Sequence, residues 1–156
     1  MKIVFIEPSS SKANVYSKLR MPLLGPVYLG TILRDRGHEV EIYHEDTYAP
    51  DYMRLKADLV GISILTSTAT RGYEIAKKVG RERVLLGGVH ASLLPEEALR
   101  HAKQVVIGEA EDVIADIVEG RLREPIVQGK AVQELDKLPF PDFSLIKGHR
   151  RKSFIM

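Results

Sequence analysis

The chain contains no cysteine and no tryptophan among its 156 residues. The missing thiols exclude, within this chain, a disulfide scaffold, a thiolate zinc site, a cysteine-ligated iron–sulfur cluster and a cysteine nucleophile. No apolar run approaches the ~18–20 residues that a membrane-spanning helix needs, and no cleavage signature follows the N-terminus. We therefore predict a cytoplasmic protein with no membrane partner.

Excess charge is also missing from the body of the chain. The 23 Lys and Arg residues oppose 21 Asp and Glu residues, and four of the basic residues lie near the C-terminus: Lys147, Arg150, Arg151 and Lys152. Without these four, the body carries a net charge of −2. A nearly neutral body offers no electrostatic footprint for nucleic acid. The chain is therefore predicted not to bind nucleic acid, and its basic tail to be a solvated stretch or a linker.

Short apolar runs rich in β-branched residues are present, and they alternate with helical patterns. Helices are predicted over about residues 22–36, from Thr68, from Pro95, and over about residues 109–119. The predicted strands are Lys2–Ile6, Glu39–Tyr43, Leu59–Ile64, Arg83–Leu86 and Gln104–Ile107, with a short extra strand near residues 125–127. Strands that alternate with helices must run parallel, with helices covering both faces of the sheet.

This rhythm predicts an α/β fold: a three-layer, flavodoxin-like (Rossmann-like), doubly wound parallel sheet of strand order 2-1-3-4-5. Residues 1–122 would form this domain. The prolines of residues 138–143 disfavour a helix, so we predict that residues 123–156 form an extended linker that leaves the domain. In such a sheet, ligands bind outside the carboxyl ends of the strands, near the switch point between the first and third strands.

Small and polar residues follow the third, fourth and fifth strands. Ser63 lies in an otherwise apolar strand and must form a hydrogen bond, either to a ligand or to a neighbouring carbonyl. Thr66 lies in the next loop, where its hydroxyl could instead cap a helix. Gly87 and Gly88 remove two side chains at a strand end, which permits either a tight turn or a flat ligand against the backbone. His90 follows as a ligand contact or an ordinary loop residue.

Gly108 and Glu109 follow the fifth strand, where acidic residues argue against a bound phosphate. The long loop after the first strand contains Ser9, Ser10 and Ser11 but lacks both the Walker and the dinucleotide glycine patterns. A phosphate cradle for a flavin and a mobile polar loop both stay open there. No loop combines a carboxylate pair or a Ser, His and Asp set, so we predict no catalytic residue and no metal site in this chain.

The ordered motifs resemble a known family. Ser63-x-Leu65 followed by Gly87-Gly88 resembles the signature of cobalamin (B12)-binding domains. More narrowly, the chain is similar to the N-terminal B12-binding-like domain of radical SAM enzymes of the magnesium-protoporphyrin cyclase-like and B12-dependent methyltransferase class. The segments that carry this resemblance are residues 22–30, 37–40, 87–91, 94–99, 106–111 and 135–141.

This resemblance implies a cobalamin-binding module without catalysis of its own. Ser63 and Leu65 would line the pocket of the nucleotide tail, and Gly87 and Gly88 would let dimethylbenzimidazole lie on bare backbone. The remaining implied cofactor-binding residues are Thr66, His90, Gly108 and Glu109. The parent protein would carry a C-terminal radical SAM domain with SAM and a [4Fe-4S] cluster, which this cysteine-free chain cannot bind.

One feature departs from better-known cobalamin domains. Those of methionine synthase and the mutases carry Asp-x-His-x-x-Gly after the first strand, where the His binds cobalt. Here Glu7-Pro8-Ser9 and the residues that follow contain no His, as is common in the radical SAM subclass. Two alternatives therefore stay open: a cobalamin-free structural or docking domain of a radical SAM protein, and a flavin-binding flavodoxin-like module.

Overall fold

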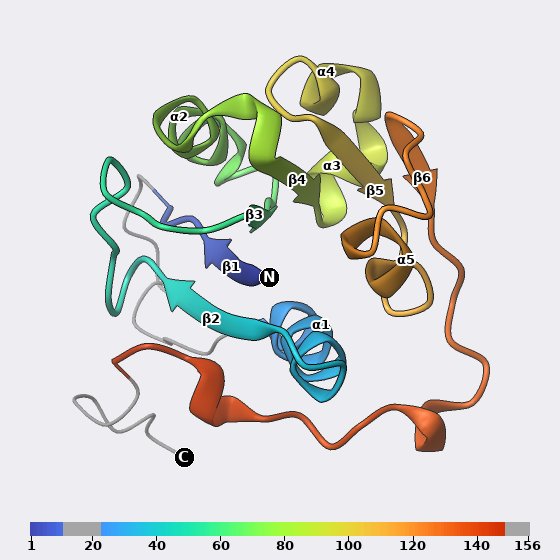
Figure 1. Cartoon of the computed structure of the whole chain (residues 1–156). Helices are drawn as coiled ribbons and strands as arrows, with labels where there is room; N and C mark the ends of the chain where they lie inside the picture. Colours follow the sequence, from blue (N-terminus) through green and yellow to red (C-terminus); the bar gives the residue numbers. More distant parts are fainter. Residues whose placement is uncertain (11–22, 149–156) are drawn as a thin grey trace.

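The computed structural model describes residues 1–10 and 23–148, and its sheet has six parallel strands in the order β2-β1-β3-β4-β5-β6 (Figure 1). This order confirms the predicted 2-1-3-4-5 arrangement and adds a sixth strand one residue from the predicted position. The strands are β1 (Lys2–Glu7), β2 (Glu39–His44), β3 (Leu59–Ser63), β4 (Val84–Gly87), β5 (Gln104–Ile107) and β6 (Ile126–Gln128).

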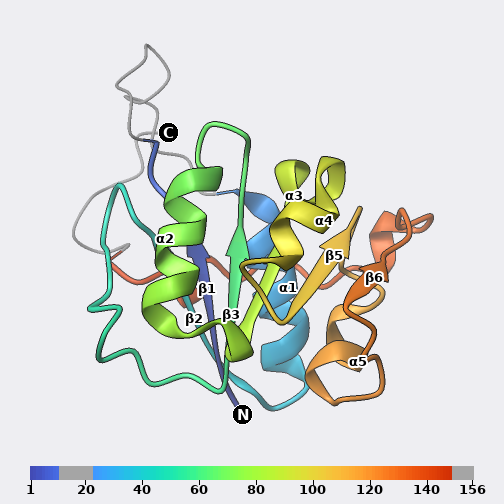
Figure 2. The ribbon, with the colours of Figure 1, turned by 90° about the horizontal axis from the view of Figure 1, so that it is seen from above.

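Helices cover both faces of the sheet (Figures 1 and 2). The α-helices are α1 (Leu24–Asp35), α2 (Ala69–Val79), α3 (Val89–Leu93), α4 (Pro95–Leu99) and α5 (Ile114–Val118). Three short 3-10 turns are η2 (Arg81–Arg83), η3 (Leu135–Lys137) and η4 (Phe143–Leu145). Helices α1 and α5 lie on one face, and α2, α3 and α4 lie on the other. Figure 2 shows α2 and α1 on opposite sides of the strands.

Alternation along the strands divides the core into two clusters, because successive side chains of a strand point to opposite faces. Val4, Ile62 and Leu86 pack on the α2–α4 side. Phe5 and Val106 pack on the α1–α5 side. The register keeps this division across the sheet, since Ile62 pairs with Leu86 and Ser63 pairs with Gly87.

Two helices differ from the prediction. The helix expected over residues 109–119 is wrong in its first half, since α5 begins at Ile114. The side chains of Glu109 and Asp112 instead accept backbone N–H groups of Val132 and Lys130, which ties residues 109–112 to the segment after β6. The loop expected after Gly88 contains helix α3, because Ser92 N and Leu94 N find carbonyl acceptors four residues back.

The segment after β6 returns to the opposite edge of the sheet, running past α1 (Figure 1). Asp142 N donates to Thr31 Oγ1 at 2.9 Å, and the Asp142 carboxylate pairs with Arg34. Ile146 is 1% exposed and forms a parallel bridge with Ile42. Strand β6 and Ile146 therefore join the same sheet, whereas the sequence pattern predicts that residues 123–156 form an extended linker that leaves the domain. The boundary at residue 122 itself stays a prediction.

Some expectations fall outside the described residues. The basic positions 150–152 and the serine at position 11 are among them. Within the described part of the chain, no helix is long and apolar enough to cross a bilayer.

Candidate functional site

A cavity of about 220 Å³ opens at the carboxyl ends of β3, β4 and β5, on the side of the sheet that α1 and α5 cover. It lies where parallel α/β sheets bind their ligands. Three groups of residues line it: the sheet, the start of α1, and the loop before α5. They are Phe5, Gly25, Pro26, Leu29, Gly61, Ile62, Ser63, Leu85, Leu86, Gly87, Gly88, Val106, Gly108, Glu109, Ala110, Glu111 and Ile114.

The floor of the cavity depends on a glycine in the middle of β3. A Cβ atom at Gly61 would meet ring atoms of Phe5 at 2.5 and 2.6 Å. Because Gly61 has no side chain, the Phe5 ring lies close against the strand. Leu85 pairs with Gly61 on the next strand and continues this apolar floor. The floor of the cavity is therefore made of carbon rather than of hydrogen-bonding groups.

The two adjacent glycines at the end of β4 serve different purposes. A Cβ atom at Gly87 would meet nothing closer than the Val106 carbonyl oxygen at 4.0 Å, so this position leaves open space beside the cavity. Gly88 has φ +93°, and a Cβ atom there would lie 2.7 Å from the Ile64 carbonyl oxygen. The backbone turn therefore requires glycine at position 88. At position 87 the backbone would accept another residue, and glycine is needed there only if a ligand occupies the adjacent space.

The far rim is the turn after β5. Gly108 has φ +78°, which favours glycine, and Glu109 follows it with an exposed side chain that bonds to Val132 N. Glu111 also lines the cavity, and burial raises the pKa of its carboxyl above the ordinary value. This rim is acidic, as expected from the sequence, and it would repel a phosphate placed against it.

Five of the eight predicted cofactor-binding residues line this cavity: Ser63, Gly87, Gly88, Gly108 and Glu109. The other three, Leu65, Thr66 and His90, are not among its lining residues. Leu65 is 38% exposed at the carboxyl edge.

His90 belongs to a polar chain on the α2–α4 side. The residue is 6% exposed, and its ring Nδ1 lies 3.2 Å from Thr66 Oγ1 and its Nε2 3.3 Å from Glu97 Oε1. The Tyr73 hydroxyl donates to the same Glu97 oxygen, and both contacts lower the pKa of Glu97, that of Tyr73 more strongly. His90 thus has a protein partner at each ring nitrogen, which is the role of an ordinary structural histidine.

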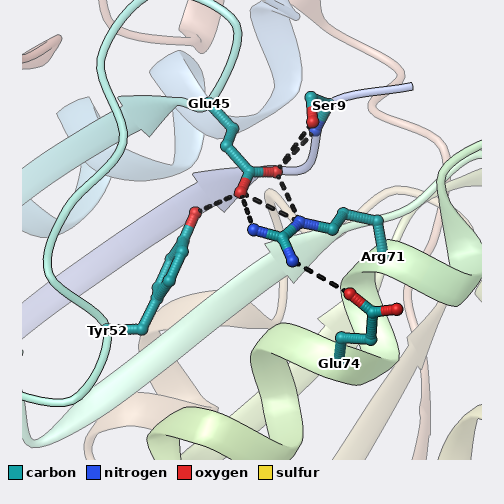
Figure 3. Close-up of polar contacts among 5 residues, drawn as sticks. All are labelled: Ser9, Glu45, Tyr52, Arg71 and Glu74. Atoms are coloured by element: carbon teal, nitrogen blue, oxygen red, sulfur yellow. Dashed lines mark hydrogen bonds and ion pairs between the residues drawn. The ribbon is translucent and has the colours of Figure 1, made fainter. Parts of the chain in front are cut away.

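The carboxylate of Glu45 connects helix α2 with the segments that follow β1 and β2 (Figure 3). It accepts the backbone N–H and the hydroxyl of Ser9 at 2.9 and 3.1 Å, the Tyr52 hydroxyl at 2.7 Å and the Arg71 guanidinium. Arg71 also pairs with Glu74. Burial raises the pKa of Glu45, but these hydrogen bonds outweigh burial and bring it to about 2. Both Ser9 donors are therefore committed to a carboxylate.

A second buried carboxyl lies on the α1 side, one strand away. Glu7 is 5% exposed and accepts the Leu23 N–H at 3.1 Å, where α1 begins. His44 Nε2 lies 3.8 Å from a Glu7 oxygen. Burial raises the pKa of Glu7 to about 7, although the Leu23 N–H opposes this shift. Within the described residues, His, Asp and Glu side chains form no group of three or more that could hold a metal ion.

Sequence reasoning missed the apolar part of the cavity. Phe5, Gly61 and Leu85 make its floor, yet each looks like an ordinary strand residue in the sequence. Alternation contains the missing signal, since Gly61 and Ser63 share one face of β3, and Leu85 and Gly87 share the same face of β4. Leu29 and Ile114 could not be found this way, because they come from helices whose placement depends on tertiary packing.

Comparisons with known proteins agree with this geometry. A family model described as the B12 binding domain matches residues 12–118. The chain is 38% identical over 105 residues to the bacteriochlorophyllide d C-8(2)-methyltransferase of Chlorobaculum tepidum, an overlap of 60% of this chain and 22% of that protein. It is 34% identical over 94 residues to the C-12(1)-methyltransferase of the same organism, covering 56% and 20%. The matched region spans about a fifth of the length of these relatives.

Solved structures share the fold at lower identity. The cobalamin-dependent S-adenosylmethionine radical enzyme OxsB, solved with aqua-cobalamin bound, matches with a TM-score of 0.62 at 16% identity, covering 90% of this chain and 24% of that one. The radical S-adenosylmethionine methyltransferase TsrM from Kitasatospora setae matches with a TM-score of 0.55 at 19% identity, covering 76% and 26%. At these identities the likeness establishes the fold.

Proposed function

The chain belongs to the B12-binding domain family, and from this premise we propose that it binds cobalamin, with the corrin above the carboxyl edge of the sheet and the nucleotide tail in the cavity between α1 and α5. The observation that carries this proposal is the cavity itself, floored by Phe5 over Gly61 and opened by Gly87. When bound, cobalamin would supply a cobalt centre able to carry an alkyl group. The chain's own residues would bind and orient it.

The size of the cavity fits part of cobalamin rather than all of it. Sites that enclose a whole drug-sized ligand usually measure about 300–1,000 Å³, whereas this cavity measures about 220 Å³. A single planar heterocycle such as dimethylbenzimidazole matches this smaller space. The much larger corrin would then remain outside, over the exposed side chains of Leu65 and Val89.

The chemistry of the lining supports the same ligand. Phe5, Leu29, Leu85 and Ile114 offer a flat heterocycle an apolar slot, and apolar burial favours such a ring by about 25 cal/mol per Å². The Ser63 side chain lies beside Gly88 at the mouth, 3.0 Å from where a Cβ of residue 88 would be. Its hydroxyl is placed to meet a polar atom of the tail.

The flavin alternative loses one of its three predicted phosphate ligands. It requires the serines after β1 to hold a phosphate, but both Ser9 donors bond to the Glu45 carboxylate. The cobalamin-free alternative predicts a cleft filled by side chains of the loop over residues 9–21. Most of that loop lies outside the described residues, and the described residues leave the cavity open. Of these readings, cobalamin binding is the one that uses the cavity.

We also propose that the chemistry of the parent protein resides in a further domain. The methyltransferases of Chlorobaculum tepidum are about five times longer than the matched region, and OxsB and TsrM are likewise much longer. A radical SAM domain with SAM and a [4Fe-4S] cluster would supply the cysteine ligands that this chain lacks. The present chain would then act as the cobalamin module of such an enzyme.

Titration with hydroxocobalamin tests the proposal directly. We expect a saturable change in the visible spectrum, with a dissociation constant below about 100 µM. A parallel titration with FMN serves as the comparison and should give no binding. Electron paramagnetic resonance of bound cob(II)alamin should lack splitting from the benzimidazole nitrogen, since the tail would leave cobalt to enter the cavity. Absence of any spectral change at about 100 µM would contradict the proposal.

A further inference from the structure

We infer that Ser92 of α3 is a positioning residue that sets the width of the cavity mouth by holding the Gly88 and Gly108 turns together. This inference rests on the proposed function, because the tail that the mouth would admit is that of cobalamin. Ser92 does not line the cavity itself. It would act through the two glycine turns that do.

One hydroxyl makes both contacts. Ser92 Oγ donates to the Gly88 carbonyl oxygen at 3.0 Å and accepts the Gly108 N–H at 3.0 Å. A hydroxyl has one proton to give and lone pairs to receive, so the two bonds are compatible. A serine in a helix often bonds to the carbonyl four residues back, and this explains the contact with Gly88. It does not explain the bond to Gly108, sixteen residues away.

The hydrogen-bonded pairing of β4 with β5 ends before the two turns, and the Ser92 hydroxyl connects the strands beyond that point. The β4–β5 ladder pairs Leu85 with Gln104 and Leu86 with Val105, and it ends there. Beyond that point the strands lead into the Gly88 and Gly108 turns, both with positive φ and both at the cavity. Within the described chain, the Ser92 hydroxyl is the hydrogen-bonded link between these turns.

Loss of this link should therefore act on the tail rather than on the corrin. In a Ser92→Ala variant, the Gly108 N–H loses its partner and the two sides of the mouth can separate. We expect hydroxocobalamin affinity to fall roughly 3- to 10-fold, the effect of one hydrogen bond. Diaquocobinamide, which has the corrin but no nucleotide tail, should bind the variant within about 2-fold of its affinity for the unchanged protein.

Two further variants sharpen the experiment. Ser92→Thr keeps the hydroxyl and should restore cobalamin affinity, whereas Ser144→Ala removes an exposed hydroxyl on the segment that packs beside α1 and should change neither affinity. Hydrogen exchange of the Gly108 amide gives a readout that needs no variant: the amide should be protected in the unchanged protein. An unprotected Gly108 amide would overturn the inference even if Ser92→Ala failed to fold.

The outcomes separate the inference from the proposed function. If the unchanged protein binds neither corrinoid, the proposed function fails and the inference fails with it. If Ser92→Ala loses affinity for both corrinoids equally, Ser92 stabilises the fold without shaping the tail site. If its cobalamin affinity is unchanged, the mouth does not depend on the hydroxyl. A selective loss for cobalamin, restored by threonine, supports the inference.

Discussion

The two faces of this sheet are built from the same strands but differ at their carboxyl ends. On the α2–α4 side, Ile62, Ile64 and Leu86 fill the space and are at most 2% exposed. On the α1–α5 side, the neighbouring positions are Ser63 and Gly87, and a cavity remains. Protein interiors are normally close-packed, and the lining of a void loses dispersion contacts. In keeping with the proposed function, we expect a ligand to complete the packing in this cavity of the described residues.

Two buried carboxyl groups, one on each face, differ in their hydrogen-bond donors and in their pKa. Glu45, on the filled side, accepts hydrogen bonds from Ser9, Tyr52 and Arg71, which outweigh burial and bring its pKa to about 2. Glu7, on the cavity side, has the Leu23 N–H as its hydrogen-bond donor, and burial raises its pKa to about 7. Burial opposes charge in both cases, so the number and charge of the donors decide the outcome.

Filling the cavity should give the largest effect. A Gly87→Leu variant places carbon atoms where a Cβ meets nothing within 4.0 Å, and position 87 has no positive φ. We expect hydroxocobalamin affinity to fall by about 100-fold or more, measured by the visible-spectrum titration. The free energy of unfolding in urea should change by less than about 1 kcal/mol.

A substitution at the neighbouring Gly88 provides the control, because it should change stability. Gly88→Ala strains a residue with φ +93° and brings a Cβ to 2.7 Å from the Ile64 carbonyl oxygen, so it should cost about 2–3 kcal/mol of unfolding free energy. If Gly87→Leu also lost stability on this scale, or still bound cobalamin normally, the difference between the two glycines would be refuted.

On the filled side, the expected effect concerns stability. Arg71→Met removes the cation beside Glu45, and breaking a buried pair costs about 3–5 kcal/mol. Because the Arg71 side chain is 28% exposed, we expect a smaller loss of about 2 kcal/mol at pH 7. Urea unfolding measures this change.

The same variant should change the acid dependence of stability. The folded pKa of Glu45, about 2, lies below its ordinary value of 4.5. Its stabilising contribution is therefore complete above pH 4.5 and is lost as the pH falls toward 2. In Arg71→Met this acid-side loss should be shallower. An equally steep loss would show that Arg71 does not hold the charge on Glu45.

The smallest expected effect concerns Glu7 on the cavity side. There the stability changes with pH in the direction opposite to that expected from Glu45. The folded pKa of Glu7, about 7, lies above its ordinary value of 4.5, so the folded protein binds more protons than the unfolded chain between these values. Stability should therefore fall as the pH rises from 4.5 to 7. Glu7→Gln keeps an acceptor for the Leu23 N–H and removes this fall.

Unfolding in urea at pH 5 and pH 8 measures the effect of Glu7→Gln. We expect Glu7→Gln to raise the free energy of unfolding at pH 8, with a much smaller difference at pH 5. His44, 3.8 Å from Glu7, is the neighbouring titratable group, and a His44→Gln variant should keep the sign of the result. A Glu7→Gln variant less stable than the unchanged protein at pH 8 would contradict the prediction.

The sequence by itself determined the parallel α/β sheet, its strand order and its family. Apolar runs of strand length alternate with helical stripes, and right-handed crossovers leave few ways to connect them. It also determined the glycine rim, since Gly87, Gly88 and Gly108 follow strands whose carboxyl ends must meet at one edge. These inferences depend on local periodicity and on rules of connection, which are written along the chain.

Only the tertiary structure decided which of the candidate residues share a space. It places His90 with Tyr73 and Glu97, away from the cavity, lays Phe5 across Gly61, and returns Ile146 to the edge of β2. Except for His90 and Glu97, these contacts join residues far apart in the chain. Their geometry depends on how the helices and loops pack on the two faces of the sheet, which local sequence patterns do not encode.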